Sequence, residues 1–259
     1  MKRIFFILLW TTIVCKGYAQ DEVITSSNEI ITKTMADSAY INNDFASAVM
    51  MYETILDKEG ESADLYYNLG NSYYKMDNIA KAVLNYEKAL LLNPGDGDIR
   101  FNLELAQSKT VDKVIPKSEM FFVLWAKSFT NAMSEKGWSK IGITAFIFTL
   151  ISLLLYFFGK KIVWKKIGFI TAICLFLVAV IANVCASTQK TEIMNHEYAI
   201  IMAPSITVKS TPNENGTDLF ILHEGRKVMI KDDTMQGWKE IQLEDGNAGW
   251  VPIDVIEII

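Results

Sequence analysis

Four hydrophobic patterns follow one another along the chain. A short apolar run at residues 4–14 precedes a stretch, ending near residue 112, in which apolar positions recur every three or four residues, as in amphipathic helices. Two long uncharged runs then occupy residues 141–158 and 167–186. From residue 198 onward, short β-rich runs alternate with turn residues. The seven runs are residues 198–202, 207–209, 219–222, 227–231, 238–243, 248–251 and 255–258. We therefore expect a multidomain chain with an all-α module, a pair of long apolar helices and an all-β module.

The helical stretch contains a repeat with a period of 34 residues, which is strongest at residues 64–94. Eight residues of this copy resemble the signature positions of the tetratricopeptide repeat family: Tyr66, Leu69, Gly70, Tyr73, Ala82, Tyr86, Ala89 and Pro94. Gly70 and Ala82 let two helices pack closely, and Pro94 ends the second helix. A weaker copy precedes this one and a single first helix follows it. We expect a solenoid of two repeats and a capping helix over residues 28–112.

The resemblance implies that the first helices of the repeats line a peptide-binding groove. The groove positions carried over to this chain are Lys33, Asp37, Tyr40, Tyr67, Asn71, Tyr74, Phe101 and Leu105. Tyrosines beside Asn71 and Lys33 would hold an extended peptide by stacking and by backbone hydrogen bonds. The alternative is that these residues are solvated or form contacts between repeats.

The two uncharged runs have the length needed to cross a hydrocarbon core about 30 Å thick. Between them, residues 159–166 contain four lysines, which the positive-inside rule places in the cytoplasm. We predict membrane spans at 139–158 and 167–186 around a cytoplasmic loop at 159–166. In a bacterial inner membrane, the helical and β modules would then both lie in the periplasm.

The N-terminal residues have the pattern of a secretory signal peptide. Lys2 and Arg3 precede the apolar run, and Gly17 and Ala19 supply the small residues before a cleavage site. We predict a signal peptide at residues 1–19, which agrees with the topology given by the lysine loop. An uncleaved anchor is the alternative. A lipidated Cys15 is disfavoured because bulky residues precede it.

Residues 118–134 are predicted to form an amphipathic helix. Phe121, Trp125, Phe129 and Met133 recur every four residues and would form one apolar face. Such a helix would lie at the bilayer surface with its aromatic face toward lipid. Packing against the repeat module is the alternative.

The β-rich stretch contains a Gly-Trp pair at Trp238, an Asp-Gly turn at Gly246 and a Gly-Trp-Val strand at Trp250. In these residues it resembles bacterial SH3 domains over residues 196–259, which implies an SH3-like barrel. Trp238 and Trp250 are ligand candidates because such domains bind peptides or cell-wall stems. A barrel of about 60 residues also needs large side chains at its centre. That structural role is the one we expect for both tryptophans.

Charge and residue usage exclude several function classes. Residues 20–116 carry a net charge of −8, residues 117–191 carry +7 and residues 192–259 carry −7. A nucleic-acid-binding protein would instead gather Lys and Arg on a folded module. Cys15, Cys174 and Cys185 are the only cysteines, and His196 and His223 are the only histidines. With no metal-ligand cluster, phosphate loop or nucleophile–base set in the sequence, we expect no cofactor and no enzymatic activity.

The order of modules and the stretch at residues 93–106 resemble the BatE-like repeat proteins of the Bat aerotolerance operons in Bacteroidetes. The resemblance implies a membrane-associated scaffold in the stress response. Its expected partners are von Willebrand A-type membrane proteins and a MoxR-type ATPase system. The residues themselves predict a membrane-anchored, non-enzymatic adaptor with two binding modules. The alternative is a cell-wall sensor that binds peptidoglycan through its SH3-like domain.

Overall fold

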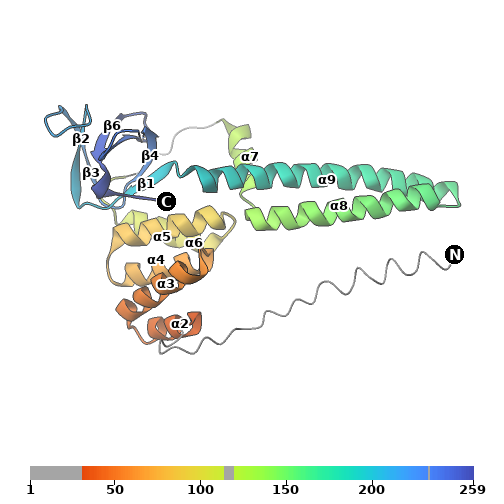
Figure 1. The fold of residues 1–259 in the computed structure, drawn as a ribbon, viewed down its shortest axis with the longest axis horizontal. Helices are drawn as coiled ribbons and strands as arrows, with labels where there is room; N and C mark the ends of the chain where they lie inside the picture. Colours follow the sequence, from red (N-terminus) through yellow and green to blue (C-terminus); the bar gives the residue numbers. More distant parts are fainter. Residues whose placement is uncertain (1–30, 114–119, 233) are drawn as a thin grey trace. The chain divides into compact units, whose positions relative to one another are not determined.

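The computed structural model describes residues 31–113, 120–232 and 234–259 (Figure 1). The predicted signal peptide at residues 1–19 lies outside the described residues, as do the first residues of the predicted repeat module. In chain order, the described part holds a helical module, a short helix, a pair of long helices and a β module.

Over residues 31–113, the helical module consists of five helices in the order that the 34-residue period predicts. They are α2 (Lys33–Ile41), α3 (Phe45–Glu59), α4 (Ala63–Lys75), α5 (Ile79–Leu92) and α6 (Gly97–Ser108). The turns within the two repeats are equivalent. Asn43 and Asp77 both have a positive φ, and the next residues, Asp44 and Asn78, cap α3 and α5 by accepting a hydrogen bond from a backbone amide at 3.2 Å.

The core of the repeats also follows the 34-residue period. Ala48 and Ala82 are completely buried, as are Tyr52 and Tyr86 to within 1%. A Cβ atom at Gly70 would lie only 2.8 Å from the ring of Tyr86. Gly70 is therefore required for α4 to approach α5 this closely, as the sequence predicts.

Three helices follow: α7 (Phe121–Thr130), α8 (Glu135–Phe158) and α9 (Ile162–Asn195). Residues 118 and 119 of the predicted helix at 118–134 lie outside the described residues. At its other end the helix stops earlier than predicted, because Asn131 caps the C-terminus of α7 and Ser134 caps the start of α8. The predicted loop at 159–166 is also too long. The connection is only residues 159–161, because nothing after Gly159 breaks a helix and α9 incorporates the last two lysines.

The long helices α8 and α9 pack against each other through small residues (Figure 1). At Gly168, a Cβ atom would lie 2.7 Å from the backbone oxygen of Ser152. Close packing of this kind is typical of helices in membranes. Both helices are long and apolar enough to cross a membrane, and only 22% and 28% of their most apolar stretches are buried. The core helices of a soluble protein would be mostly buried.

The β module contains seven strands, which correspond to the seven predicted β-rich runs. They are β1 (Tyr198–Ile201), β2 (Ser205–Lys209), β3 (Asp218–His223), β4 (Lys227–Asp232), β5 (Trp238–Gln242), β6 (Ala248–Pro252) and β7 (Ile256–Ile258), with a 3-10 turn, η1 (Ile253–Val255), before the last strand. They form one antiparallel sheet in the order β3-β2-β6-β5-β4-β1-β7.

The predicted closure of this sheet into a barrel is not confirmed. Within the described residues no ladder joins the two edge strands, β3 and β7, so the sheet is open. The edge strand β7 has three residues, and the following Ile259 packs into the hydrophobic cluster of the repeat helices and not into the sheet. The β module is therefore an open antiparallel sheet.

Candidate binding sites

The first-helix face of the repeat module, defined here by the predicted groove residues of α2, α4 and α6, contains two groups of hydrogen bonds. The first is centred on Asp37, whose carboxylate accepts from Lys33 Nζ at 2.8 Å and from the Tyr52 hydroxyl at 2.7 Å. Asn68 Nδ2 of the next repeat lies 3.4 Å away. Burial opposes the charge of Asp37, but the hydrogen bonds from Lys33 and Tyr52 outweigh it. They hold its pKa below the usual 3.8.

The second group is centred on Asn71 and crosses from α4 to α6. Asn71 Oδ1 accepts from the Tyr86 hydroxyl at 2.7 Å and from Asn102 Nδ2 at 3.0 Å. Asn102 Nδ2 also donates to the Tyr67 hydroxyl oxygen at 2.9 Å. Burial, with smaller contributions from neighbouring tyrosines, raises the pKa of Tyr86 well above its usual value. Asn71 and Tyr67 thus hold the repeats together, which is the alternative role named for them above.

Four of the predicted groove residues form the apolar and aromatic part of this face. Phe101 and Leu105 of α6 are 65% and 42% exposed, although both are apolar. Tyr40 and Tyr74 are half-buried against the repeat core. Lys109 Nζ lies 4.3 Å from the centre of the Tyr74 ring. The first-helix face therefore joins a fixed polar floor to exposed aromatic and aliphatic side chains.

Sequence reasoning did not assign a role to Asn68 and Asn102, which make the hydrogen bonds between the first helices. The signal was present, because these residues are 34 positions apart and occupy the same place in the repeat. An amide at this position reaches the preceding first helix: Asn68 reaches Asp37, and Asn102 reaches Tyr67 and Asn71.

The β module places its two tryptophans away from its buried core. The core consists of aliphatic residues such as Val208, Ile241 and Val251. Trp238 and Trp250 occupy the alternate, partly exposed positions of β5 and β6, on the opposite face of the sheet from Ile241 and Val251. The expected role at the centre of the module is therefore wrong for both. The open sheet is filled by smaller side chains.

The repeat module and the β module share an interface with buried charges. The Glu87 side chain of α5 is 7% exposed and pairs with Lys227 Nζ of β4 at 2.7 Å. The Asp112 carboxylate, after the end of α6, accepts a hydrogen bond from the backbone amide of His223 at 2.7 Å. Its other oxygen lies 2.9 Å from Nδ1 of the same histidine. Ile200 of β1 belongs to the hydrophobic cluster of the repeat helices. No local sequence signal reveals these pairs, because 111 residues separate Asp112 from His223.

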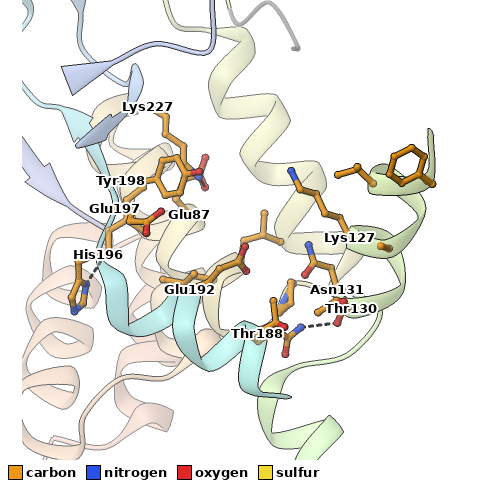
Figure 2. A pocket seen from close by; sticks show the side chains of 18 residues that line it. Glu87, Lys127, Thr130, Asn131, Thr188, Glu192, His196, Glu197, Tyr198 and Lys227 are labelled. Carbon is orange, nitrogen blue, oxygen red and sulfur yellow. Dashed lines mark hydrogen bonds and ion pairs between the residues drawn. The ribbon is translucent and has the colours of Figure 1, made fainter. Parts of the chain in front are cut away.

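A cavity of 680 Å³ lies among α5, α7, the end of α9 and β1 (Figure 2). Its walls include apolar side chains of α5 and α7 and polar side chains of α9. Among the lining residues are Leu90, Phe122, Lys127, Gln189 and Glu192. Gln189 donates from Nε2 to the backbone oxygens of Thr130 and Met133, both at 2.7 Å, and thereby ties α9 to the end of α7.

Some side chains of α7 line this cavity, and others are exposed on the surface. Phe122, Ala126 and Thr130 line the cavity. Phe121 and Trp125, one turn apart, are 84% and 72% exposed. The helix α7 therefore has one face toward the cavity beside α5 and an aromatic face that is exposed.

Comparison with known families supports one part of this description. Residues 63–96 match the family model of the tetratricopeptide repeat, and they include α4 and α5. The curated proteins that were compared with the chain include no match to it. The repeat supports a role in protein–protein interaction, and with the two apolar helices it fits a repeat-containing membrane protein.

Proposed function

We propose that this protein is a non-enzymatic, membrane-anchored adaptor that binds protein partners through the first-helix face of its repeat module. The proposal rests on the composition of that face. Phe101 and Leu105 are exposed beside a polar floor that is fixed by hydrogen bonds. Exposed apolar side chains on a rigid scaffold are typical of peptide-binding surfaces.

The hairpin of α8 and α9 supports the anchoring part of the proposal. The Trp138 side chain, near the start of α8, donates to the Thr130 backbone oxygen at 2.8 Å, and Gln189 of α9 reaches the same oxygen. The start of α8 and the end of α9 therefore meet at one end of the hairpin. If the hairpin crosses a membrane, the modules before and after it lie on the same side, and the lysine-containing turn lies on the other.

The partners that we propose are those implied by the BatE-like module order, namely von Willebrand A-type membrane proteins acting with a MoxR-type ATPase in stress tolerance. Both modules would face the periplasm. A partner that contacts both of them would gain from the high effective concentration that a common anchor creates.

A photo-crosslinking amino acid at position 101 in intact cells tests the proposal. Met50 on α3 is the matched control position, because it is 67% exposed but lies on a second helix. We expect a defined crosslink to a von Willebrand A-type partner from position 101 that is lost in Leu105→Ala and is absent from position 50. Equal crosslinking from both positions would contradict a role for the first-helix face.

The outward placement of Trp238 and Trp250 favours one second candidate, a cell-wall sensor that binds peptidoglycan through the β module. Partly exposed tryptophans on a sheet provide flat apolar surfaces for ligand contact. Co-sedimentation of the detergent-solubilised full chain with purified sacculi tests this function. Binding that is lost in Trp250→Ala and retained in the Trp164→Ala control would support it. No sedimentation, or an equal loss in both variants, would exclude it.

A further inference from the structure

The side chain of Gln189 provides an acceptor without a donor in the wall of the 680 Å³ cavity. The residue is 2% exposed, and its Oε1 atom is buried with no hydrogen-bond partner. Both N–H groups of Nε2 are directed at backbone oxygens, those of Thr130 and Met133. Rotating the amide by half a turn would place its oxygen against these two oxygens. The orientation of the unpaired acceptor is therefore fixed by the chemistry of its neighbours.

Such an acceptor costs about 1–3 kcal/mol when it is left without a partner. The cavity therefore fits a molecule that donates a hydrogen bond to Gln189. Glu192 lies three residues further along α9, on the same helix face, and also lines the cavity (Figure 2). Glu87 is already neutralised by Lys227 at 2.7 Å. A carboxylate beside a fixed amide oxygen is the recognition pattern for an ammonium group.

The remaining walls favour a ligand with an apolar part and an anionic group. Leu90 and Phe122 supply apolar surface from α5 and α7. Lys127 of α7 lines the same cavity, and Figure 2 shows it on the α7 side while Glu192 is on the α9 side. A zwitterion that carries a hydrocarbon chain matches this distribution of charge and apolar surface.

The position of the cavity along α9 indicates where such a ligand comes from. Gln189 and Glu192 are three and six residues beyond the apolar run that ends at residue 186. At a rise of 1.5 Å per residue they lie about 4.5 and 9 Å past its end. In a membrane-spanning hairpin, this is the depth of the lipid headgroups. This step rests on the membrane crossing assumed in the proposed function.

We propose that the cavity among α5, α7, α9 and β1 binds an aminophospholipid. Its primary ammonium group donates to Gln189 Oε1 and pairs with Glu192. Its phosphate lies toward Lys127, and the first part of its acyl chains contacts Leu90 and Phe122.

Titration of the full chain in detergent tests the proposal with three probes: short-chain phosphatidylethanolamine, phosphatidylcholine with the same acyl chains, and free phosphoethanolamine. The choline headgroup has no N–H donor and otherwise resembles the ethanolamine lipid. We expect phosphatidylethanolamine to bind at least about tenfold more tightly than phosphatidylcholine, because a hydrogen bond to a buried acceptor is lost. Equal binding of the two lipids would overturn the proposal. Equally tight binding of phosphoethanolamine would overturn the assignment to a lipid.

Two variants test whether the lipid binds in this cavity. Glu192→Gln removes the carboxylate at an exposed position and should weaken binding of both lipids, because both headgroups are cationic. Leu90→Trp places a bulkier side chain at the apolar wall of the cavity and should weaken binding of both lipids. Val111→Trp, at a residue that is 68% exposed outside the cavity, is the control and should bind as the parent protein does. Affinities for both lipids that are unchanged in the two cavity variants would place the lipid elsewhere and overturn the proposal.

The outcome can be separated from that of the proposed function. Lipid binding measured in detergent requires neither a bilayer crossing nor a protein partner. Loss of lipid selectivity in a chain that still crosslinks from position 101 would remove this site alone. Lipid selectivity in a chain that gives no such crosslink would leave the site intact and remove the adaptor function.

Discussion

At the scale of single residues, a few positions that recur at 34-residue intervals determine how the repeat module packs. Ala48 and Ala82 are both completely buried, and the tyrosines four residues after them fill the space between helices. Gly70 allows α4 to reach Tyr86. The same residues that resemble the family signature are therefore those whose volume sets the distance between helices.

Replacing Gly70 with alanine should destabilise the repeat module by about 1–3 kcal/mol, because the added Cβ atom would lie 2.8 Å from the Tyr86 ring in a packed core. Gly97→Ala is the matched control. Gly97 is also in a helix, but a Cβ atom there has no neighbour within 4 Å. Urea unfolding of the full chain in detergent, followed by circular dichroism, measures both. Equal midpoints for the two variants would contradict the packing described for Gly70.

The lowered pKa of Asp37 predicts a specific dependence of stability on pH. A carboxyl group with a depressed pKa stabilises the folded state fully above its unfolded value of 3.8 and loses this contribution as the pH falls through the folded value. We expect Asp37→Asn to lower the unfolding free energy by about 1 kcal/mol at neutral pH. The difference from the parent protein should shrink at about pH 2.5. A difference that is the same at both pH values would show that the charge of Asp37 is not responsible.

At the scale of elements, hydrophobic periodicity predicted the helices and strands well. The 34-residue period located α2 to α6. The β-rich runs between turn residues located all seven strands to within two residues at each end. Periodicity failed where a contact has no local signal. The pairing of Asp112 with His223 and the acceptor at Gln189 depend on residues that are distant in the chain. The tryptophans were misplaced because their size suggested burial, while their positions in β5 and β6 alternate with the core residues.

The ion pair between α5 and β4 should stabilise the interface between the repeat and β modules. Lys227→Ala leaves the buried Glu87 carboxylate without its cation, which costs on the order of 2 kcal/mol. Lys88→Ala is the control, because Lys88 pairs with Glu257 at 3.7 Å and that carboxylate is half-exposed. Hydrogen exchange of β1 and α5 should accelerate in the first variant and change little in the second. Similar exchange in both variants would contradict a structural role for the buried pair.

At the scale of the whole molecule, the pair of helices α8 and α9 is the feature that would anchor both modules in a membrane. Their facing sides carry small residues, their outer sides carry large apolar ones, and a turn of residues 159–161 joins them. If this hairpin crosses a membrane, it places the repeat module and the β module on one side. This arrangement favours the adaptor function, because a partner that contacts both modules would gain from the high effective concentration that a common anchor creates.

Labelling with a thiol reagent that does not cross membranes tests this arrangement directly in intact cells. Single cysteines are introduced at Val111, Met235 or Lys160 after Cys15, Cys174 and Cys185 have been replaced. Val111 and Met235 are exposed positions in the two modules, and Lys160 lies in the turn of the hairpin. We predict that positions 111 and 235 are labelled and that position 160 is labelled only after the membrane is permeabilised. Labelling of position 160 in intact cells, or of only one of the two modules, would contradict the account.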